Sequence, residues 1–176
     1  MRHRIRAAGL ILQHDFILLV LHRNPNNGLE LWVPPGGGLI ASDNSIFAAA
    51  KREIFEETGL TVAINRISHI REFRDIDNHI HHIEFFMPVD SYAGELTISN
   101  MRAGDEDAPF IQAVKWIKRT GLSQIPVYPE WLQSDKFWNE AKLNFPETRY
   151  TESASGTSKL MFGYPSNTKN NRRQST

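Results

Sequence analysis

The chain carries the stretch Arg52-Glu53-Ile54-Phe55-Glu56-Glu57-Thr58-Gly59-Leu60 downstream of the glycine run Pro35-Gly36-Gly37-Gly38. In a helix, Glu53, Glu56 and Glu57 stand at i, i+3 and i+4 and fall within about a quarter of the circumference. Like charges at this spacing repel each other. A bound divalent cation would offset that repulsion, and Mg²⁺ and Mn²⁺ prefer oxygen ligands of this kind. The stretch therefore predicts a helix with a metal site.

Length and composition predict one globular domain with no general attraction for polyanions. The chain has 176 residues, enough for one domain with a core. Its 20 Lys+Arg balance 20 Asp+Glu, so an anionic substrate must be bound locally. With Cys 0, the chain has no disulfide, thiolate metal site or cysteine nucleophile, which fits a reducing cytoplasm.

The most apolar stretch, residues 7–21, does not predict a membrane span. Gln13-His14-Asp15 divides it into two runs that are too short to cross a bilayer. Basic residues precede it, as in a signal peptide, but no small-residue cleavage site follows. We therefore expect an untargeted cytoplasmic protein with no membrane partner.

Hydrophobic patterns and turn residues predict the order strands, helix, strands, helix. The predicted strands cover residues 5–12, 16–22, 31–33, 61–73, 79–89 and 113–117. The first two form a hairpin, and the third ends at prolines and glycines that read as a loop. One helix covers residues 46–57, with N-caps offered at 42–44 and a stop at Gly59. A second, amphipathic helix covers residues 129–143 and is opened by a proline.

The composition becomes polar from about residue 144. We therefore predict a domain at 1–143 and a polar, mobile C-terminal tail at 144–176. The basic residues of the tail could contact an anionic partner, but a solvated tail is the favoured interpretation.

Residues 38–60 resemble the signature of the Nudix hydrolases, a glycine loop followed by a helix with the pattern Arg-Glu-apolar-x-Glu-Glu-x-Gly-apolar. The second half matches at every specified position, namely at Arg52, Glu53, Ile54, Glu56, Glu57, Gly59 and Leu60. Trp32 and Pro35 resemble the usual lead-in of the family. The resemblance reaches roughly from residue 4 to residue 142. It implies an α/β fold, a Nudix-type α/β/α sandwich with a mixed central sheet.

The first half of the signature departs from the family pattern. Counted back from Arg52, the position of the usual first glutamate is Asn44. Counted forward from Pro35 and Gly37, Asp43 takes that place instead. In the family this glutamate mainly supports the loop and the arginine. The departure therefore concerns the geometry of the loop and the rate more than the existence of the site.

The resemblance implies a metal-dependent pyrophosphohydrolase with Mg²⁺ or Mn²⁺ as cofactor. Such enzymes split a nucleoside diphosphate linked to another moiety by water attack on phosphorus. Charge accumulates on the phosphate oxygens, so electrostatic stabilisation dominates the reaction. By resemblance, Glu56 and Glu57 are direct metal ligands, Glu53 is a ligand or the catalytic base, and the carbonyl of Gly37 completes the shell.

The remaining residues of the motif position the reacting groups. Arg52 would orient a glutamate through a charge-assisted hydrogen bond and belongs with Glu53 and Glu56 to the expected catalytic set. Gly36, Gly37 and Gly38 would bind phosphate, because glycines allow positive φ and a close approach of the backbone.

Other acids and histidines give weaker signals. Glu84 and Glu106 are candidates for a catalytic base outside the motif, although an ordinary exposed or strand-edge acid is the favoured interpretation of each. Alternation places His79 and His81 on one strand face, where they could bind zinc. A polar sheet face or a substrate wall is the favoured interpretation of that pair.

Substrate identity stays open among a nucleotide-sugar, ADP-ribose and a nucleoside triphosphate. The expected partner is a small-molecule nucleotide, nucleic acid is not favoured, and a homodimer remains open. One alternative is a Nudix-fold nucleotide-binding or regulatory protein without catalysis, which the missing first glutamate supports. Another is an RNA-end pyrophosphohydrolase, which would depend on the basic tail.

Overall fold

Three sheets and two α-helices make up the described part of the chain, residues 1–25, 27–100 and 110–152 of a computed structural model. The first strands are β1 Arg2–Leu10, β2 Leu12–Gln13, β3 Phe16–Arg23, β4 Glu30–Val33 and β5 Gly36–Gly38. The later strands are β6 Thr61–Ala63, β7 His69–Asp75, β8 Ile80–Pro88, β9 Ser91–Ala93, β10 Ile111–Lys118 and β11 Arg149–Glu152. The helices are α1 Ile46–Thr58 and α2 Asp135–Lys142, with 3-10 helices η2 Arg119–Gln124 and η3 Glu130–Gln133.

The largest sheet is mixed and has the strand order β11-β7-β8-β1-β5. Its centre is β1, which runs parallel to β8 and antiparallel to β5. This register places Arg6 between Glu84 on β8 and Gly38 on β5. A second sheet has the order β10-β3-β2 with β4 paired to β3, and β6 and β9 form a third.

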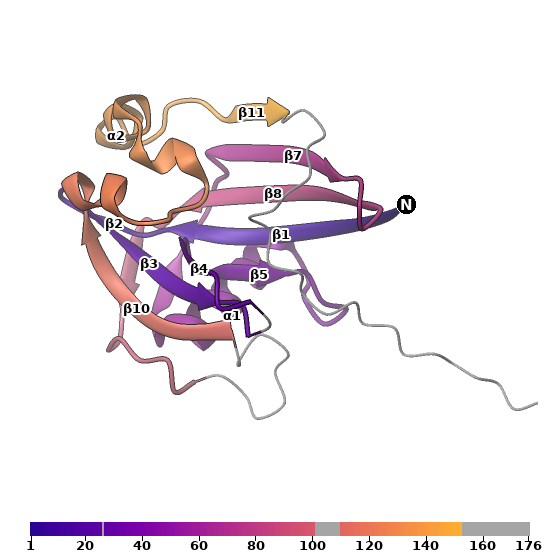
Figure 1. Cartoon of the computed structure of the whole chain (residues 1–176). Coiled ribbons are helices and arrows are strands. Elements are labelled where there is room, and N and C mark those ends of the chain that lie inside the picture. The colour runs from indigo at the N-terminus through magenta and orange to yellow at the C-terminus, as the bar shows by residue number, and fades with distance from the viewer. Residues whose placement is uncertain (26, 101–109, 153–176) are drawn as a thin grey trace, which may run out of the picture.

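The two faces of β1 pack against different helices, which lie on opposite sides of the sheet in Figure 1. Ala7 belongs to a buried cluster with Ile54 of α1, whereas its neighbour Ala8 belongs to a cluster with Phe137 of α2. Successive strand residues point to opposite faces, so the sheet separates two cores. Burying a side chain such as Ile54 stabilises the fold by about 1.5–3 kcal/mol. The predicted α/β/α sandwich with a mixed central sheet is confirmed.

Helix α1 forms where the sequence predicts it, but with a different cap. Ser45, and not a residue at 42–44, is the N-cap, and its Oγ accepts a hydrogen bond from the Ala48 amide at 3.1 Å. Gly59 ends the helix as predicted, with φ 76° and its amide bonded to the Phe55 carbonyl. Ser45 suits the cap because its extended backbone lets the hydroxyl reach the first free amides.

Two long predicted elements are each divided in the structure. The strand predicted at 61–73 splits into β6, which pairs with β9, and β7, which joins the large sheet. The helix predicted at 129–143 splits into η3 and α2 at Ser134, whose hydroxyl caps α2 by accepting from the Phe137 amide at 3.2 Å. The local hydroxyl competes with helix continuation at this position.

The glycine run is a strand rather than a free loop, because Gly36–Gly38 pairs with β1. The predicted hairpin is formed only at its tip, where Leu12 pairs with Ile17. Beyond that tip, β1 and β3 belong to different sheets.

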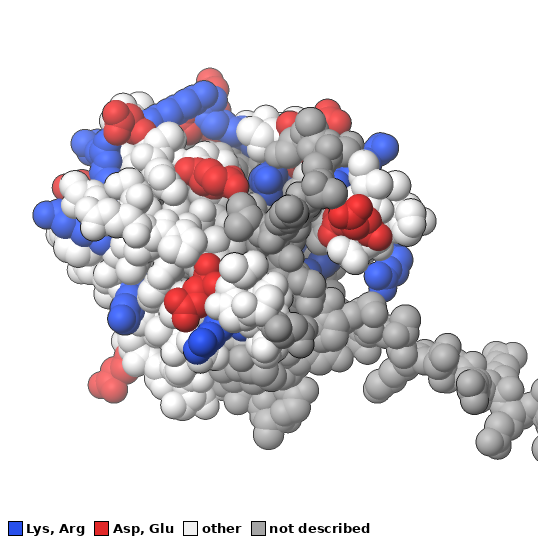
Figure 2. Space-filling view, viewed as in Figure 1, with Lys and Arg blue, Asp and Glu red and all other residues white. Residues whose placement is uncertain are grey.

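Part of the predicted tail is also structured. Strand β11 pairs in parallel with β7, so the chain contributes an edge strand to the large sheet after residue 144. Residues 153–176 lie outside the described residues, and the division at residue 143 stays a prediction. No helix of the described residues is long and apolar enough to cross a membrane. Figure 2 shows basic and acidic side chains interspersed over one face of the described molecule.

Candidate metal and phosphate site

The three glutamates of α1 are almost completely buried. Glu53 is 7% exposed, Glu56 8% and Glu57 2%. They face the short strand β5, whose glycines leave room for carboxylates to approach the backbone. A Cβ on Gly37 would lie 2.5 Å from the Glu53 carboxyl carbon, so that space is already taken by Glu53. Buried carboxylates need hydrogen-bond or ionic partners, and the neighbouring residues supply them.

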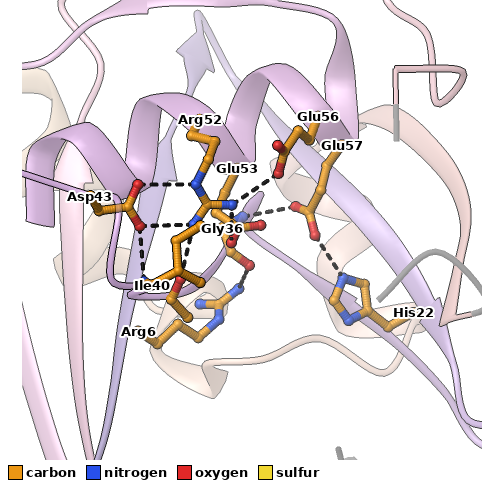
Figure 3. A network of polar contacts seen from close by, with 10 residues as sticks. Arg6, His22, Gly36, Ile40, Asp43, Arg52, Glu53, Glu56 and Glu57 are labelled. Atoms are coloured by element: carbon orange, nitrogen blue, oxygen red, sulfur yellow. Dashed lines mark hydrogen bonds and ion pairs between the residues drawn. The ribbon is translucent and has the colours of Figure 1, made fainter. Parts of the chain in front are cut away.

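Arg52 is the main partner of this cluster and lies at its centre in Figure 3. Its Nη1 donates to Glu53 Oε1 at 2.8 Å and to Glu56 Oε2 at 2.9 Å. Its Nη2 donates to the Gly38 carbonyl at 3.1 Å. Its Nε and Nη2 also donate to Asp43, to Oδ1 at 3.0 Å and to Oδ2 at 2.9 Å. One planar guanidinium therefore connects the helix, the glycine strand and the loop between them.

Asp43 is the candidate for the supporting acid that contacts Arg52. It binds Arg52 through both carboxylate oxygens, and its Oδ2 also accepts from the Ile40 amide at 3.0 Å. Asn44, the other candidate, is exposed. The hydrogen bond from Arg52 lowers the pKa of Asp43, and the same bond raises the pKa of Arg52. Both groups are therefore held in their charged forms.

Glu57 ties α1 to β5. Its Oε2 accepts from the Gly36 amide at 2.8 Å, and its Oε1 lies 3.5 Å from His22 Nε2. Gly36 has φ 152°, and a Cβ there would lie 2.3 Å from the Ala7 carbonyl oxygen. Only glycine fits at this close approach between β5 and β1. At Gly38, by contrast, a Cβ would meet nothing within 4 Å.

The donor set fits a hard divalent cation by its chemistry. Carboxylate oxygens of Glu53 and Glu56 and the nearby backbone of Gly37 are the ligand types that Mg²⁺ and Mn²⁺ prefer. Among the described residues, however, no three acidic or histidine side chains converge in the arrangement of a metal site. Arg52 Nη1 lies against both carboxylates, as its two hydrogen bonds show. The cation and the guanidinium would therefore share these oxygens.

The predicted histidine pair is not formed. His79 lies in the turn before β8 with φ 54°, so alternation does not place it with His81. His81 Nε2 instead lies 2.6 Å from Glu72 Oε1. The ring of His82 points to the other face, where it stacks on Phe73 at 4.5 Å between centroids. Within the described residues, this strand provides a polar surface and no zinc site.

Of the two acids outside the motif, Glu84 is described and Glu106 lies outside the described residues. Glu84 is only 4% exposed, so the interpretation as an ordinary exposed acid is wrong. Its Oε2 accepts from the hydroxyl of Tyr128 at 2.5 Å and lies 3.5 Å from Arg71 Nη1. Burial raises the pKa of Glu84, while the charges of nearby arginines lower it.

Arg6 is a site residue that sequence reasoning missed. Its Nη2 donates to the Pro34 carbonyl at 2.9 Å and to the Gly36 carbonyl at 3.1 Å. Gly36 is therefore held from both sides, by Glu57 at its amide and by Arg6 at its carbonyl. The available signal was a charged residue inside an apolar strand, where a buried arginine requires acceptors.

Known proteins of solved structure share this fold. A family model described as the NUDIX domain matches residues 2–138. No curated protein matches the sequence. A MutT protein from Bacillus halodurans is 23% identical, with a TM-score of 0.61 over 86% of this chain and 89% of that chain. A NUDIX hydrolase from Nitrosomonas europaea is 18% identical, with a TM-score of 0.60 over 84% and 93% of the two chains. An ADP-ribose pyrophosphatase from Streptococcus suis is 19% identical, with a TM-score of 0.50 over 86% and 98%.

Proposed function

Because the chain belongs to the Nudix hydrolase family, we propose that it cleaves a nucleoside diphosphate linked to another moiety and uses Mg²⁺ or Mn²⁺. As a member of this family the chain is a Nudix pyrophosphohydrolase in general, and we infer in addition its metal and its class of substrate. The candidate substrates are a nucleotide-sugar, ADP-ribose and a nucleoside triphosphate. One solved structure of the same fold is an ADP-ribose pyrophosphatase, which keeps that substrate among them.

The observation that carries the proposal is the position of the Arg52 guanidinium. It contacts Asp43, Glu53 and Glu56 at 2.8–3.0 Å, so one guanidinium holds three acidic side chains next to one another in a mostly buried place. Three acidic side chains and one guanidinium, mostly buried beside a glycine strand, suit the binding of a dication and a diphosphate better than they suit a structural core.

Each residue of the cluster has a proposed task. Glu53 and Glu56 would hold the cation together with Glu57 and the Gly37 carbonyl, and Glu53 would be the residue that accepts a proton from water if it is not needed as a ligand. A bound Mg²⁺ or Mn²⁺ supplies charge neutralisation at the phosphate oxygens and a water of lowered pKa. Arg52 keeps the carboxylates oriented and has other acceptors, including the Gly38 carbonyl at 3.1 Å, when a glutamate turns to the cation.

Backbone amides of the glycine strand would position the diphosphate by donating hydrogen bonds to its oxygens. Gly36 and Gly37 lie against Glu57 and Glu53, so a phosphate there is within reach of the cation ligands. Gly38 offers open space at its α-carbon, which leaves that end of the strand accessible. Fixing the reacting groups in this way lowers the entropic part of the barrier.

The non-catalytic alternative depended on the missing first glutamate. Asp43 makes the contacts to Arg52 and to the loop that this glutamate would make, which favours the enzyme. The RNA-end alternative depended on the basic tail, and residues 153–176 lie outside the described residues. Removal of residues 153–176 tests it, because that alternative requires RNA cleavage to be lost while free nucleotides are still hydrolysed.

The proposal is tested with a panel of nucleotide-sugars, ADP-ribose and nucleoside triphosphates, each with Mg²⁺, with Mn²⁺ and with a chelator. We expect hydrolysis of at least one compound that requires the metal. Glu56→Gln should lower kcat by at least about 100-fold, since it removes a charged metal ligand. The matched control is Glu147→Gln, an exposed glutamate after α2. A chain that binds these compounds but cleaves none, or a fully active Glu56→Gln, contradicts the proposal.

A further inference from the structure

A buried polar cluster outside the motif occupies the face of the large sheet that points away from α1. It consists of Arg6 on β1, Glu84 on β8, Arg71 on β7 and Tyr128 before η3. Residues two positions apart on a strand point to the same face. Ala8 follows Arg6 by two positions and Phe86 follows Glu84 by two positions, and both pack in the same core as α2. A carboxylate and two guanidiniums at this place are costly to bury and are not required to fill an apolar core.

The cluster adjoins the proposed diphosphate site through Gly36. Arg6 Nη2 binds the Gly36 carbonyl at 3.1 Å, and Arg6 is the register partner of Glu84 on β8. Strand β8 lies two strand spacings from β5, or about 10 Å. Because β5 is the last strand of this sheet, a nucleotide whose diphosphate lies on the α1 side would pass around that edge, and its ribose would span the distance to Glu84. The moiety beyond that ribose would be the base.

The cluster has unfilled hydrogen-bonding capacity. Among the described residues, both polar contacts of Glu84 use Oε2, which leaves Oε1 as an acceptor. Arg6 Nη1 is buried and has no hydrogen-bond partner in that part of the chain, and the same holds for Nε2 of His82, which lies two residues before Glu84 on β8 and on the same face. These two residues are only 8% and 7% exposed. Buried polar atoms without partners are rare in folded proteins and point to a missing ligand or water.

Arg71 places the N–H donors of its guanidinium beside the carboxylate of Glu84. Its guanidinium lies 4.6 Å from the centroid of the Phe73 ring and 4.8 Å from that of Tyr128, so two aromatic rings restrain it. Its side chain is still 15% exposed. A guanidinium fixed in this way can donate to a ring nitrogen or a keto oxygen, next to a carboxylate that only accepts.

We propose that Glu84, oriented by Tyr128 and Arg71, selects the base of the substrate by accepting a hydrogen bond from an exocyclic amino group. This rests on the proposed function, since it assigns the nucleoside end of the same substrate. A carboxylate accepts the N–H of an amino group, as it does from the N4 amino group of cytosine. A keto oxygen at that position would face the lone pairs of Glu84 and be rejected. The class of substrate is therefore an amino-bearing nucleotide, with adenine, cytosine or guanine as its base.

The test compares pairs of nucleotides that differ at the amino group. The pairs are GTP and ITP, CTP and UTP, and ADP-ribose and its hypoxanthine counterpart. In at least one pair, we expect the amino-bearing member to be preferred by about tenfold or more in kcat/KM, the size of a charge-assisted hydrogen bond. Glu84→Gln should bring that ratio within about twofold of one, because a carboxamide both donates and accepts. Equal rates for every pair, or an unchanged ratio in Glu84→Gln, overturn the inference.

The matched control is Glu72→Gln. Glu72 is a neighbour of Arg71 on β7 but faces the opposite side of the sheet, where it contacts His81 and Tyr150. Its replacement should leave the ratio as in the wild type. If Glu84→Gln does not fold, Tyr128→Phe is the variant that tests the inference. It removes only the hydroxyl that donates to Glu84, and it should lower the kcat/KM ratio of the nucleotide pair several-fold. A wild-type ratio in Tyr128→Phe then overturns the inference.

Binding separates this inference from the proposed function. If no compound is hydrolysed, the proposed function fails. The contact between Glu84 and the base is then tested separately by calorimetry, from the Kd values of GMP, AMP and IMP and from those of CMP and UMP. We expect the amino-bearing monophosphate of at least one pair to bind about tenfold more tightly. Equal Kd values, or no binding by any of them, overturn the base contact. If the protein hydrolyses both members of every pair equally well, the proposed function is supported and only the role of Glu84 in base selection is contradicted.

Discussion

Replacing Asp43 by alanine removes three hydrogen bonds at once. Two of them come from the Nε and Nη2 of Arg52 at 3.0 and 2.9 Å, and one comes from the Ile40 amide at 3.0 Å. The Asp43 side chain is 5% exposed, whereas that of Arg52 is 20% exposed. Breaking a fully buried ion pair costs about 3–5 kcal/mol, and the exposure of Arg52 reduces this to about 2–3 kcal/mol.

Two effects of Asp43→Ala are expected. The melting temperature should fall by about 5–10 °C, as the estimated loss implies for a domain of this size. The catalytic efficiency kcat/KM should fall by about 10–100-fold, the effect usual for residues that orient metal ligands. Arg52 would still contact Glu53 and Glu56 at 2.8 and 2.9 Å, so the apparent metal affinity should weaken while the site persists.

The assay is a melting curve and a Mg²⁺ titration of hydrolysis, and Asn44→Ala is the matched control. Asn44 is the neighbouring position and is exposed, so its replacement should change the melting temperature by less than about 2 °C. The double variant Asp43→Ala, Asn44→Glu should not recover the activity. Recovery in that variant, or equal losses in the two single variants, would show that Asn44 and not Asp43 supports Arg52.

Two more predictions concern pH and the glycine strand. Burial lowers the pKa of His69 to about 4, against about 6.5 in the unfolded chain, so only the unfolded state gains the proton between these values. Stability should therefore fall by up to about 1.4 kcal/mol per pH unit as the pH drops from about 6.5 to 4, and urea midpoints of His69→Gln should fall less. Gly36→Ala should cost more than about 3 kcal/mol because its Cβ would lie 2.3 Å from the Ala7 carbonyl oxygen. Gly38→Ala, with open space, should cost less than about 1 kcal/mol in the same unfolding assay; similar losses at both positions would contradict this reasoning.

Local sequence patterns predicted those helices and strands whose ends are set by residues close to them in the sequence. The helical spacing of the glutamates and the stop at Gly59 predicted α1 within one residue of its observed end at Thr58. The family pattern also named Asp43 as one of two registers for the supporting acid. Only the fold decides between them, because the choice depends on which side chain reaches Arg52 across the loop.

Pairings between distant segments were not predictable in the same way. The glycines of β5 form a strand because β1 offers them a partner, and nothing within the run itself indicates that partner. Arg6 and Glu84 acquire their environment from the same register. Glu84 was interpreted as an ordinary acid since a single acidic residue in a strand carries no sign of the arginines and the tyrosine that surround it.

Strand β11 has a consequence for the integrity of the isolated domain. It pairs in parallel with β7 from His69 to Glu72 and so covers the outer edge of the large sheet. A chain shortened at residue 143, where the composition suggests a boundary, would leave unpaired those backbone N–H and C=O groups of β7 that face away from β8. Exposed edges of this kind recruit strands from other molecules and promote aggregation. The last few described residues thus replace the seven-residue edge of β7 by the four-residue edge of β11, and a very short edge strand is one way in which proteins limit such pairing.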